Sequence, residues 1–139
     1  MIHAIDHINL VVSDLGKSVQ FYTKLLGFRE TKRAHLEGKW IEAIVGLKGI
    51  SADVVYILAS AGEPRLELLC YKSPKGEAIP LNSLANTIGL RHIAVRVDGI
   101  HNMAKRLKDA GVKVISEPVI VPASTITHEA GQKTLCYIL

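Results

Sequence analysis

The feature that most constrains the fold of this chain is an internal repeat. Two segments of the 139-residue sequence share one order of parts: a histidine that opens a short apolar run, an aspartate, a stretch with helical spacing, and a glycine. The glycine follows the histidine by 20 positions in the first copy (His7 to Gly27) and by 19 in the second (His92 to Gly111). Because repeated supersecondary units bury a core by packing together, this pattern predicts two related structural units.

Each copy is predicted to begin with a strand, because its apolar run is short and rich in β-branched residues. Side chains alternate between the faces of a strand, so His7 and Asn9 share one face of residues 7–12 and leave the other face apolar. His92 and Arg96 share a face of residues 92–97 in the same way. Each strand therefore has one face suited to packing under a helix and a histidine on the other.

A helix is predicted after each of these strands. Apolar residues recur at helical spacing through residues 15–26 and 99–110. Asp14 and Asp98 are suitable N-cap residues, and a glycine that can adopt the left-handed conformation ends each helix. Both units therefore open as strand and helix.

Three further strands are predicted in the first unit, at residues 40–45, 54–59 and 66–71, which makes it a βαβββ unit. The charged segment around His35 is predicted to be a loop.

The second unit is predicted to continue with a strand start at residues 113–115, a proline-bounded segment at 117–122 and a strand at 134–139. Leu139 corresponds to Ala59 of the first unit, so the last strand of the second repeat is expected to be absent from this sequence. The predicted organisation is one domain, residues 1–139, with repeat one at 1–72, a linker at 73–89 and an incomplete repeat two at 90–139.

Composition excludes several classes of protein. The net charge is +4, but the basic residues are scattered and only 5% of residues are aromatic, which does not support a nucleic-acid-binding surface. No apolar run approaches the ~20 residues of a membrane span, and the N-terminus does not look like a signal peptide. A cytoplasmic protein with free thiols at Cys70 and Cys136 is expected. The mildly basic surface favours an anionic small-molecule substrate.

The paired units resemble the vicinal oxygen chelate superfamily, which includes glyoxalase I, methylmalonyl-CoA epimerase, extradiol dioxygenases and bleomycin-resistance proteins. The motifs that carry the resemblance are Asp6-His7-Ile8, Asp14-Leu15, Phe21-Tyr22, Leu26-Gly27-Phe28, Leu66-Glu67-Leu68-Leu69 and Leu90-Arg91-His92-Ile93-Ala94. The resemblance implies an α+β fold in which two βαβββ repeats form cupped mixed sheets around a cleft. It also implies a homodimer, because these proteins often pair their sheets between two chains.

The resemblance further implies a divalent metal ion held by a histidine from each first strand and a carboxylate or amide from each last strand. In this sequence His7, Glu67 and His92 occupy three of those positions, and the fourth has no counterpart before the chain ends. Two imidazoles and carboxylates suit Zn, Ni, Co, Mn or Fe. In a purely structural interpretation, the histidines would be satisfied core residues and Glu67 would lie on an exposed strand face.

Glu42 is a candidate catalytic base, and Glu67 is a second candidate catalytic residue. Methylmalonyl-CoA epimerases are similar here, with a glutamate on the second strand that acts as a base. A cleft of low polarity would raise the pKa of such a carboxylate toward the working pH. A strand glutamate can equally be solvated or paired with a cation. His128 is a weaker candidate, at the cleft mouth or in a loop.

The leading functional prediction is a metal-dependent lyase or isomerase that forms an enolate from a small thioester or hemithioacetal, like glyoxalase I or methylmalonyl-CoA epimerase. One alternative is an extradiol-type Fe(II) dioxygenase. Another is a non-catalytic protein of the bleomycin-resistance type, which would bind a small molecule without a metal ion.

Overall fold

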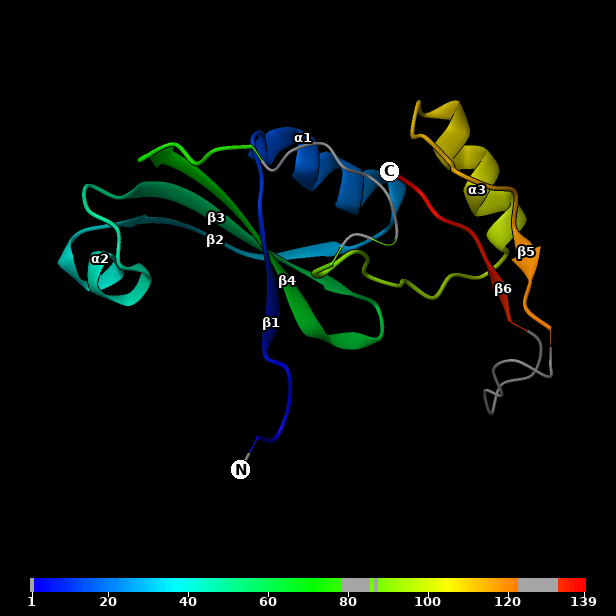
Figure 1. The fold of residues 1–139 in the computed structure, drawn as a ribbon, viewed down its shortest axis with the longest axis horizontal. Helices are drawn as coiled ribbons and strands as arrows, with labels where there is room; N and C mark the ends of the chain where they lie inside the picture. The colour runs from blue at the N-terminus through cyan, green and yellow to red at the C-terminus, as the bar shows by residue number, and fades with distance from the viewer. Residues whose placement is uncertain (1, 79–85, 87, 123–132) are drawn as a thin grey trace. The chain divides into compact units, whose positions relative to one another are not determined.

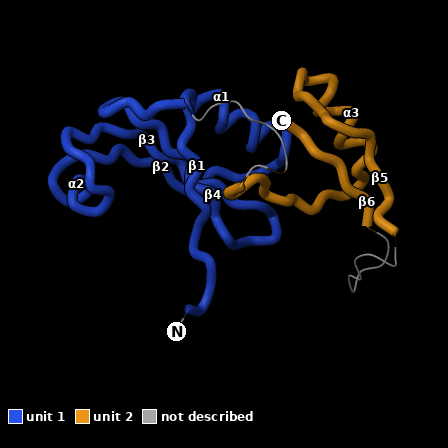
Figure 2. The backbone as a smooth tube through the Cα atoms, viewed as in Figure 1, with its two compact units in different colours: residues 1–78 blue, residues 79–139 orange. Residues whose placement is uncertain are grey.

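The computed structural model describes residues 2–78, 86, 88–122 and 133–139, which form two compact units, residues 1–78 and 79–139 (Figure 2). The boundary between the units falls inside the predicted linker, residues 73–89. Residues 79–85 and 87 of that linker, and the candidate residue His128, lie outside the described residues. No helix among the described residues is both long enough and apolar enough to cross a membrane.

The first unit is a four-stranded mixed sheet with helices (Figure 1). The strand order is β1-β4-β3-β2; β1 is parallel to β4, and the other neighbours are antiparallel. Its elements are β1 (His7–Val11), α1 (Leu15–Gln20), the π-helical turn η1 (Phe21–Leu25), β2 (Arg29–Glu37), α2 (Lys39–Val45), β3 (Ser51–Ala59) and β4 (Gly62–Ser73). This confirms a βαβββ unit, with a short additional helix between its second and third strands.

The prediction was wrong about which segment forms the second strand. Residues 40–45 belong to helix α2, which lies between Gly38 and the left-handed C-cap Gly46 (φ 72°). The second strand is instead β2, in the charged segment that was predicted to be a loop around His35. Because β2 is an edge strand and most of its side chains are exposed, its sequence lacks the apolar alternation of a half-buried strand.

The segment after β1 follows its sequence signals closely. The carboxylate of Asp14 caps α1 by accepting a hydrogen bond from the backbone nitrogen of Lys17 at 2.9 Å. Helical structure continues through η1, and Gly27 follows it with φ 76°. The predicted helix at residues 15–26 is therefore confirmed, with a π-helical last turn.

The two faces of this sheet differ in what packs against them. Helix α1 lies over one face, where Val55, Ile57 and Leu68 are fully buried. The opposite face is only partly covered: Ile41 of α2 packs with Val54, Leu69 and neighbouring residues. Over β1 and β4, this second face of the unit carries polar side chains that hydrogen-bond to one another. The sheet therefore separates a structural face from a face that is available for chemistry.

The second unit contains helix α3 (Ile100–Asp109) and strands β5 (Val119–Ile120) and β6 (Thr134–Leu135). Strands β5 and β6 pair antiparallel, and an isolated bridge joins Val114 to Ile138. The helix predicted at residues 99–110 is confirmed, and Gly111 follows it with φ 83°. The N-cap is Gly99 rather than the predicted Asp98, and no side chain caps this helix.

The strand predicted at residues 92–97 is not formed. In the first unit, β1 is held by backbone hydrogen bonds to β4. Among the residues that the structure describes, no strand pairs with residues 92–97. The prediction was wrong because a strand needs a neighbour to satisfy its backbone groups. Cys70 and Cys136 are free thiols, as predicted.

Candidate metal centre

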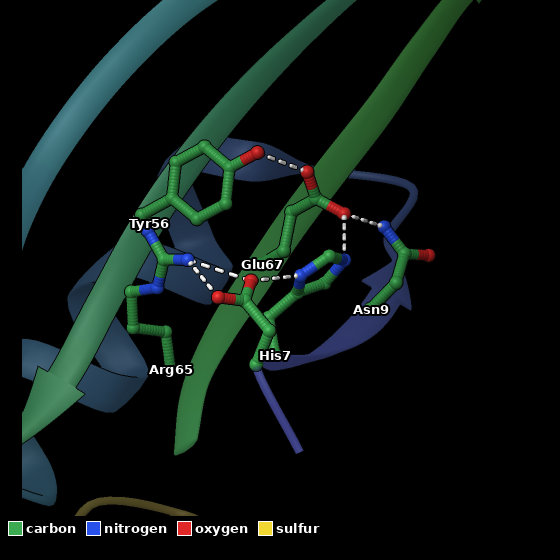
Figure 3. A network of polar contacts seen from close by, with 6 residues as sticks. His7, Asn9, Tyr56, Arg65 and Glu67 are labelled. Carbon is green, nitrogen blue, oxygen red and sulfur yellow. Dashed lines mark hydrogen bonds and ion pairs between the residues drawn. The ribbon is translucent and has the colours of Figure 1, made fainter. Parts of the chain in front are cut away.

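A network of polar side chains lies on the face of the sheet opposite α1, over β1, β3 and β4 (Figure 3). The strand register explains how it assembles. Parallel pairing of β1 with β4 places His7 opposite Arg65 and Asn9 opposite Glu67, and antiparallel pairing places Tyr56 of β3 on the other side of Glu67. Glu67 is therefore flanked from both neighbouring strands.

The carboxylate of Glu67 is held from two sides. Tyr56 Oη donates a hydrogen bond to Oε1 at 2.5 Å, and Asn9 Nδ2 donates one to Oε2 at 2.6 Å. The Glu67 side chain is only 13% exposed, so its charge would be unfavourable there without these donors. The two hydrogen bonds therefore stabilise the carboxylate and also set its direction.

The hydrogen bond to Glu67 raises the pKa of Tyr56 to about 12, with desolvation as a smaller cause. Tyr56 therefore stays protonated at neutral pH and remains a donor. It is a positioning group for Glu67 and is not suited to act as a base.

Unfolding free energy is expected to depend on Tyr56 in alkaline solution. Because folding raises the pKa of Tyr56 from 10.0 to about 12, the stabilisation is complete below pH 10 and is lost as the pH rises toward 12. Urea unfolding of the wild type should show this loss, and Tyr56→Phe should show a smaller one. Equal losses in the two proteins would contradict the assignment.

His7 is oriented from its other ring nitrogen. Its Nδ1 lies 2.8 Å from Oδ2 of Asp6, and the Arg65 guanidinium donates to both Asp6 oxygens, at 2.8 and 2.6 Å. The hydrogen bonds from His7 and Arg65 lower the pKa of Asp6, so this carboxylate is ionised and accepts the bond. For a neutral His7 ring, this contact favours the tautomer with hydrogen on Nδ1 and a lone pair on Nε2.

The Nε2 atom of His7 faces Glu67 Oε2 at 3.5 Å. With hydrogen on Nδ1 alone, the facing atoms of the neutral ring and of the carboxylate are both acceptors, and they repel unless Nε2 is protonated or a cation lies between them. Two ligands that each lie about 2.0–2.2 Å from one ion are about 3.0–3.5 Å apart. The separation and the donor types of His7 and Glu67 therefore fit a shared divalent cation, with imidazole and carboxylate as ligands.

The first unit brings together two of the three predicted ligands, and the third, His92, belongs to the second unit. There its Nδ1 lies 3.3 Å from the hydroxyl of Tyr137, and the two rings meet edge to face. Among the residues that the structure describes, no cluster of three or more His, Cys, Asp or Glu side chains is arranged to hold a metal ion.

Glu42 differs from its predicted setting, because it lies on α2 and not on a strand. Its carboxylate accepts hydrogen bonds from Lys39 Nζ at 2.9 Å and from the backbone nitrogen of Gly49 at 2.8 Å. These contacts, with that of Lys39 the larger, lower the pKa of Glu42. The expected rise in its pKa is therefore wrong. The carboxylate joins α2 to the segment that leads into β3.

Sequence reasoning missed Asp6, Tyr56 and Arg65 as parts of the site. Asp6 could have been found, because it directly precedes His7. Tyr56 and Arg65 could not, because their place depends on the register of β3 and β4 beside β1. Asn9 was correctly placed on the His7 face, but its contact with Glu67 also depends on that register.

Comparison with known proteins agrees with this fold. The family model of the glyoxalase/bleomycin resistance protein/dioxygenase superfamily matches residues 4–128. A 2-epi-5-epi-valiolone epimerase from Actinomyces sp is 25% identical over 130 residues, which cover 91% of this chain and 69% of the relative.

Solved structures show the same fold. A glyoxalase family protein from Bacillus cereus superposes with a TM-score of 0.83 and 24% identity, over 99% of this chain and 87% of that one. The trypanothione-dependent glyoxalase I of Leishmania major gives a TM-score of 0.59 and 17% identity, over 84% of this chain and 72% of that one. The matched motifs, the mixed α+β fold and the family model agree, and the chain belongs to the glyoxalase/bleomycin resistance protein/dioxygenase superfamily.

Proposed function

We propose that this protein is a metal-dependent isomerase or lyase that removes a proton from the carbon next to a carbonyl group and forms an enolate. The observation that carries the proposal is the pair of facing acceptors, His7 Nε2 and Glu67 Oε2, 3.5 Å apart. The epimerase relative supports it, because its name describes inversion at a carbon centre in a carbonyl-containing compound.

In this proposal His7, Glu67 and His92 hold a divalent metal ion, and these donor types suit Zn, Ni, Co, Mn or Fe. When bound, the ion polarises the substrate carbonyl and stabilises the negative oxygen of the enolate. Tyr56 and Asn9 hold the Glu67 carboxylate in place through the hydrogen bonds at 2.5 and 2.6 Å. A carbonyl substrate of small size, such as a thioester or hemithioacetal, fits this chemistry.

The proposal is tested by isotope exchange in deuterated water. The protein, purified without chelator and supplied with one divalent metal at a time, is incubated with an acyl-CoA, a hemithioacetal and 2-epi-5-epi-valiolone. We expect deuterium to enter the carbon next to the carbonyl of at least one compound, and to require His92. Exchange that is absent with every metal and compound, or that is equal in His92→Ala, would contradict the proposal. Oxygen uptake with a catechol would favour a dioxygenase instead.

Glu42 is proposed as the base, and its contacts make that role testable. Its pKa is lowered mainly by Lys39, so removing this cation should raise the pKa of Glu42. We expect Lys39→Met to move the acid limb of the pH profile of exchange to higher pH. Glu42→Gln should lower exchange by about 10²–10⁴-fold. A profile that Lys39→Met does not move, together with exchange retained in Glu42→Gln, would assign the base elsewhere.

A homodimer is also proposed, on the basis that members of this superfamily often pair their sheets between chains. Sedimentation equilibrium at micromolar concentration should then give twice the chain mass of 15.1 kDa. A single species at the mass of one chain would refute the dimer.

A further inference from the structure

We propose that Asp6, anchored by Arg65, is a positioning residue that holds His7 in the tautomer with hydrogen on Nδ1 and so presents the Nε2 lone pair to the candidate metal centre. This inference rests on the proposed metal-dependent function in one respect: that function supplies the metal ion that the Nε2 lone pair would bind. The tautomer itself can be tested in the metal-free protein.

The contacts of Asp6 form a continuous chain from β4 to the His7 ring. The Arg65 guanidinium donates to both oxygens of Asp6, and Asp6 Oδ2 accepts from His7 Nδ1 at 2.8 Å. The backbone nitrogen of Arg65 also donates to the carbonyl of Asp6 at 3.3 Å. Asp6 is therefore held by both its backbone and its side chain, although the carboxylate is largely open to solvent.

Arg65 is itself held in place. Its guanidinium lies 5.3 Å from the centre of the Tyr56 ring, a distance typical of a cation–π contact (Figure 3). Tyr56 in turn donates to Glu67. The residue that orients the His7 ring and the residue that orients the Glu67 carboxylate are thus in contact through Arg65. One network sets the direction of both candidate ligands.

The tautomer decides what His7 can do. A neutral imidazole carries its hydrogen on one nitrogen and a lone pair on the other. Hydrogen on Nε2 would direct a donor at Glu67 Oε2 and leave no lone pair on that side of the ring for a cation. Hydrogen on Nδ1, bonded to a carboxylate, leaves Nε2 free to bind a metal, and such outer partners also make the ligand more basic.

A different interpretation is that Asp6 only forms a surface ion pair with Arg65, and that its contact with His7 has no effect on the ring. Exposed ion pairs of this kind contribute little to stability. This interpretation predicts that removing the Asp6 carboxylate leaves the His7 tautomer unchanged, so the two can be separated by a direct measurement.

The measurement is a two-bond nitrogen–proton correlation spectrum of the histidine rings in the metal-free, ¹⁵N-labelled full chain. The pH should be about two units above the usual histidine pKa of ~6.5, so that rings with ordinary pKa values are neutral. We expect the wild type to show His7 with hydrogen on Nδ1. Asp6→Ala should convert His7 to a mixture with hydrogen on Nε2, whereas Asp6→Asn, whose amide oxygen can still accept, should keep the wild-type pattern.

The chain offers a matched control in a second histidine–aspartate pair. His35 Nδ1 lies 2.7 Å from Asp53 Oδ1, and this pair lies on the opposite face of the sheet. Asp53→Ala should change the His35 signals and leave those of His7 unaltered. A His7 pattern that is the same in the wild type and in Asp6→Ala would overturn the proposal.

Binding of Co²⁺ alone, followed by titration calorimetry, gives the second readout. Loss of an outer partner of this kind lowers metal affinity by about 10–100-fold, so Asp6→Ala should bind Co²⁺ that much more weakly and Asp6→Asn should recover most of the loss. If the wild type binds no metal but Asp6→Ala still shifts the tautomer, the metal-dependent function fails and the positioning role stands. If Co²⁺ binds and the tautomer does not depend on Asp6, the reverse holds.

Discussion

Replacing His7 with alanine is expected to weaken Co²⁺ binding by more than about 100-fold, because loss of a ligand should exceed the ~10–100-fold effect of losing one of its outer partners. The imidazole is one of two groups in the first unit that present acceptor atoms to one point, 3.5 Å apart. Without it, Glu67 would be the one proposed ligand left in the first unit, and a carboxylate alone binds a divalent ion weakly. Titration calorimetry on the chelator-treated protein measures the change directly.

The matched control is His35→Ala. His35 is an exposed histidine that also contacts a carboxylate, but it lies on the other face of the sheet, where it pairs with Asp53. Its removal should leave Co²⁺ affinity within about twofold of the wild type, since it adds no ligand to the Glu67 side. Glu67→Gln should behave like His7→Ala. Affinity that falls equally in His35→Ala would show that binding is at an unrelated surface site.

Replacing Leu68 with alanine should lower the free energy of unfolding by about 2–5 kcal/mol. Leu68 is completely buried on the face beneath α1, where it lies opposite Val55 of β3. The substitution removes buried apolar surface and leaves a cavity among strands that pair on both sides and cannot close around it easily. Urea unfolding, with the midpoint and the slope fitted separately, measures this loss.

Ile44→Ala is the control for this prediction. Ile44 is 71% exposed on α2, so its truncation removes little buried surface and should change stability by less than about 0.5 kcal/mol. A Leu68→Ala variant no less stable than Ile44→Ala would mean that the face beneath α1 is not the main core. Leu68 directly follows Glu67, so the two side chains lie on opposite faces of β4. The comparison therefore tests the face that packs under α1 without changing the face that carries Glu67.

Local signals in the sequence account for the first half of the fold. The helix after β1 begins at the Asp14 cap and ends before Gly27, as predicted, because capping and left-handed glycine are interactions between near neighbours in the chain. The alternation of β1 was also correct: Ile8 is half-buried and His7 is exposed. Such features can be predicted from sequence, since they depend on few residues and short distances.

Two secondary-structure predictions were wrong because they concern segments whose structure depends on distant parts of the chain. Residues 40–45 combine apolar residues in a way that suits both a short strand and a short helix, and the packing of Ile41 on the sheet, with the left-handed cap at Gly46, favours the helix. Residues 92–97 have the composition of a strand, but no strand among the described residues pairs with them. In both segments the secondary structure depends on tertiary contacts, so the sequence pattern did not predict it.

The sequence by itself predicted two related units, correctly placed His7 and Glu67 on strands, and put Asp6 next to His7. Only the tertiary structure decided that Tyr56 and Asn9 hold the Glu67 carboxylate and that Arg65 reaches Asp6. The physical reason is register: a shift of one residue between β1 and β4 would turn Asn9 to the face opposite Glu67 and break their contact. Register depends on pairing between segments about 60 positions apart, and no local sequence pattern predicts such pairing.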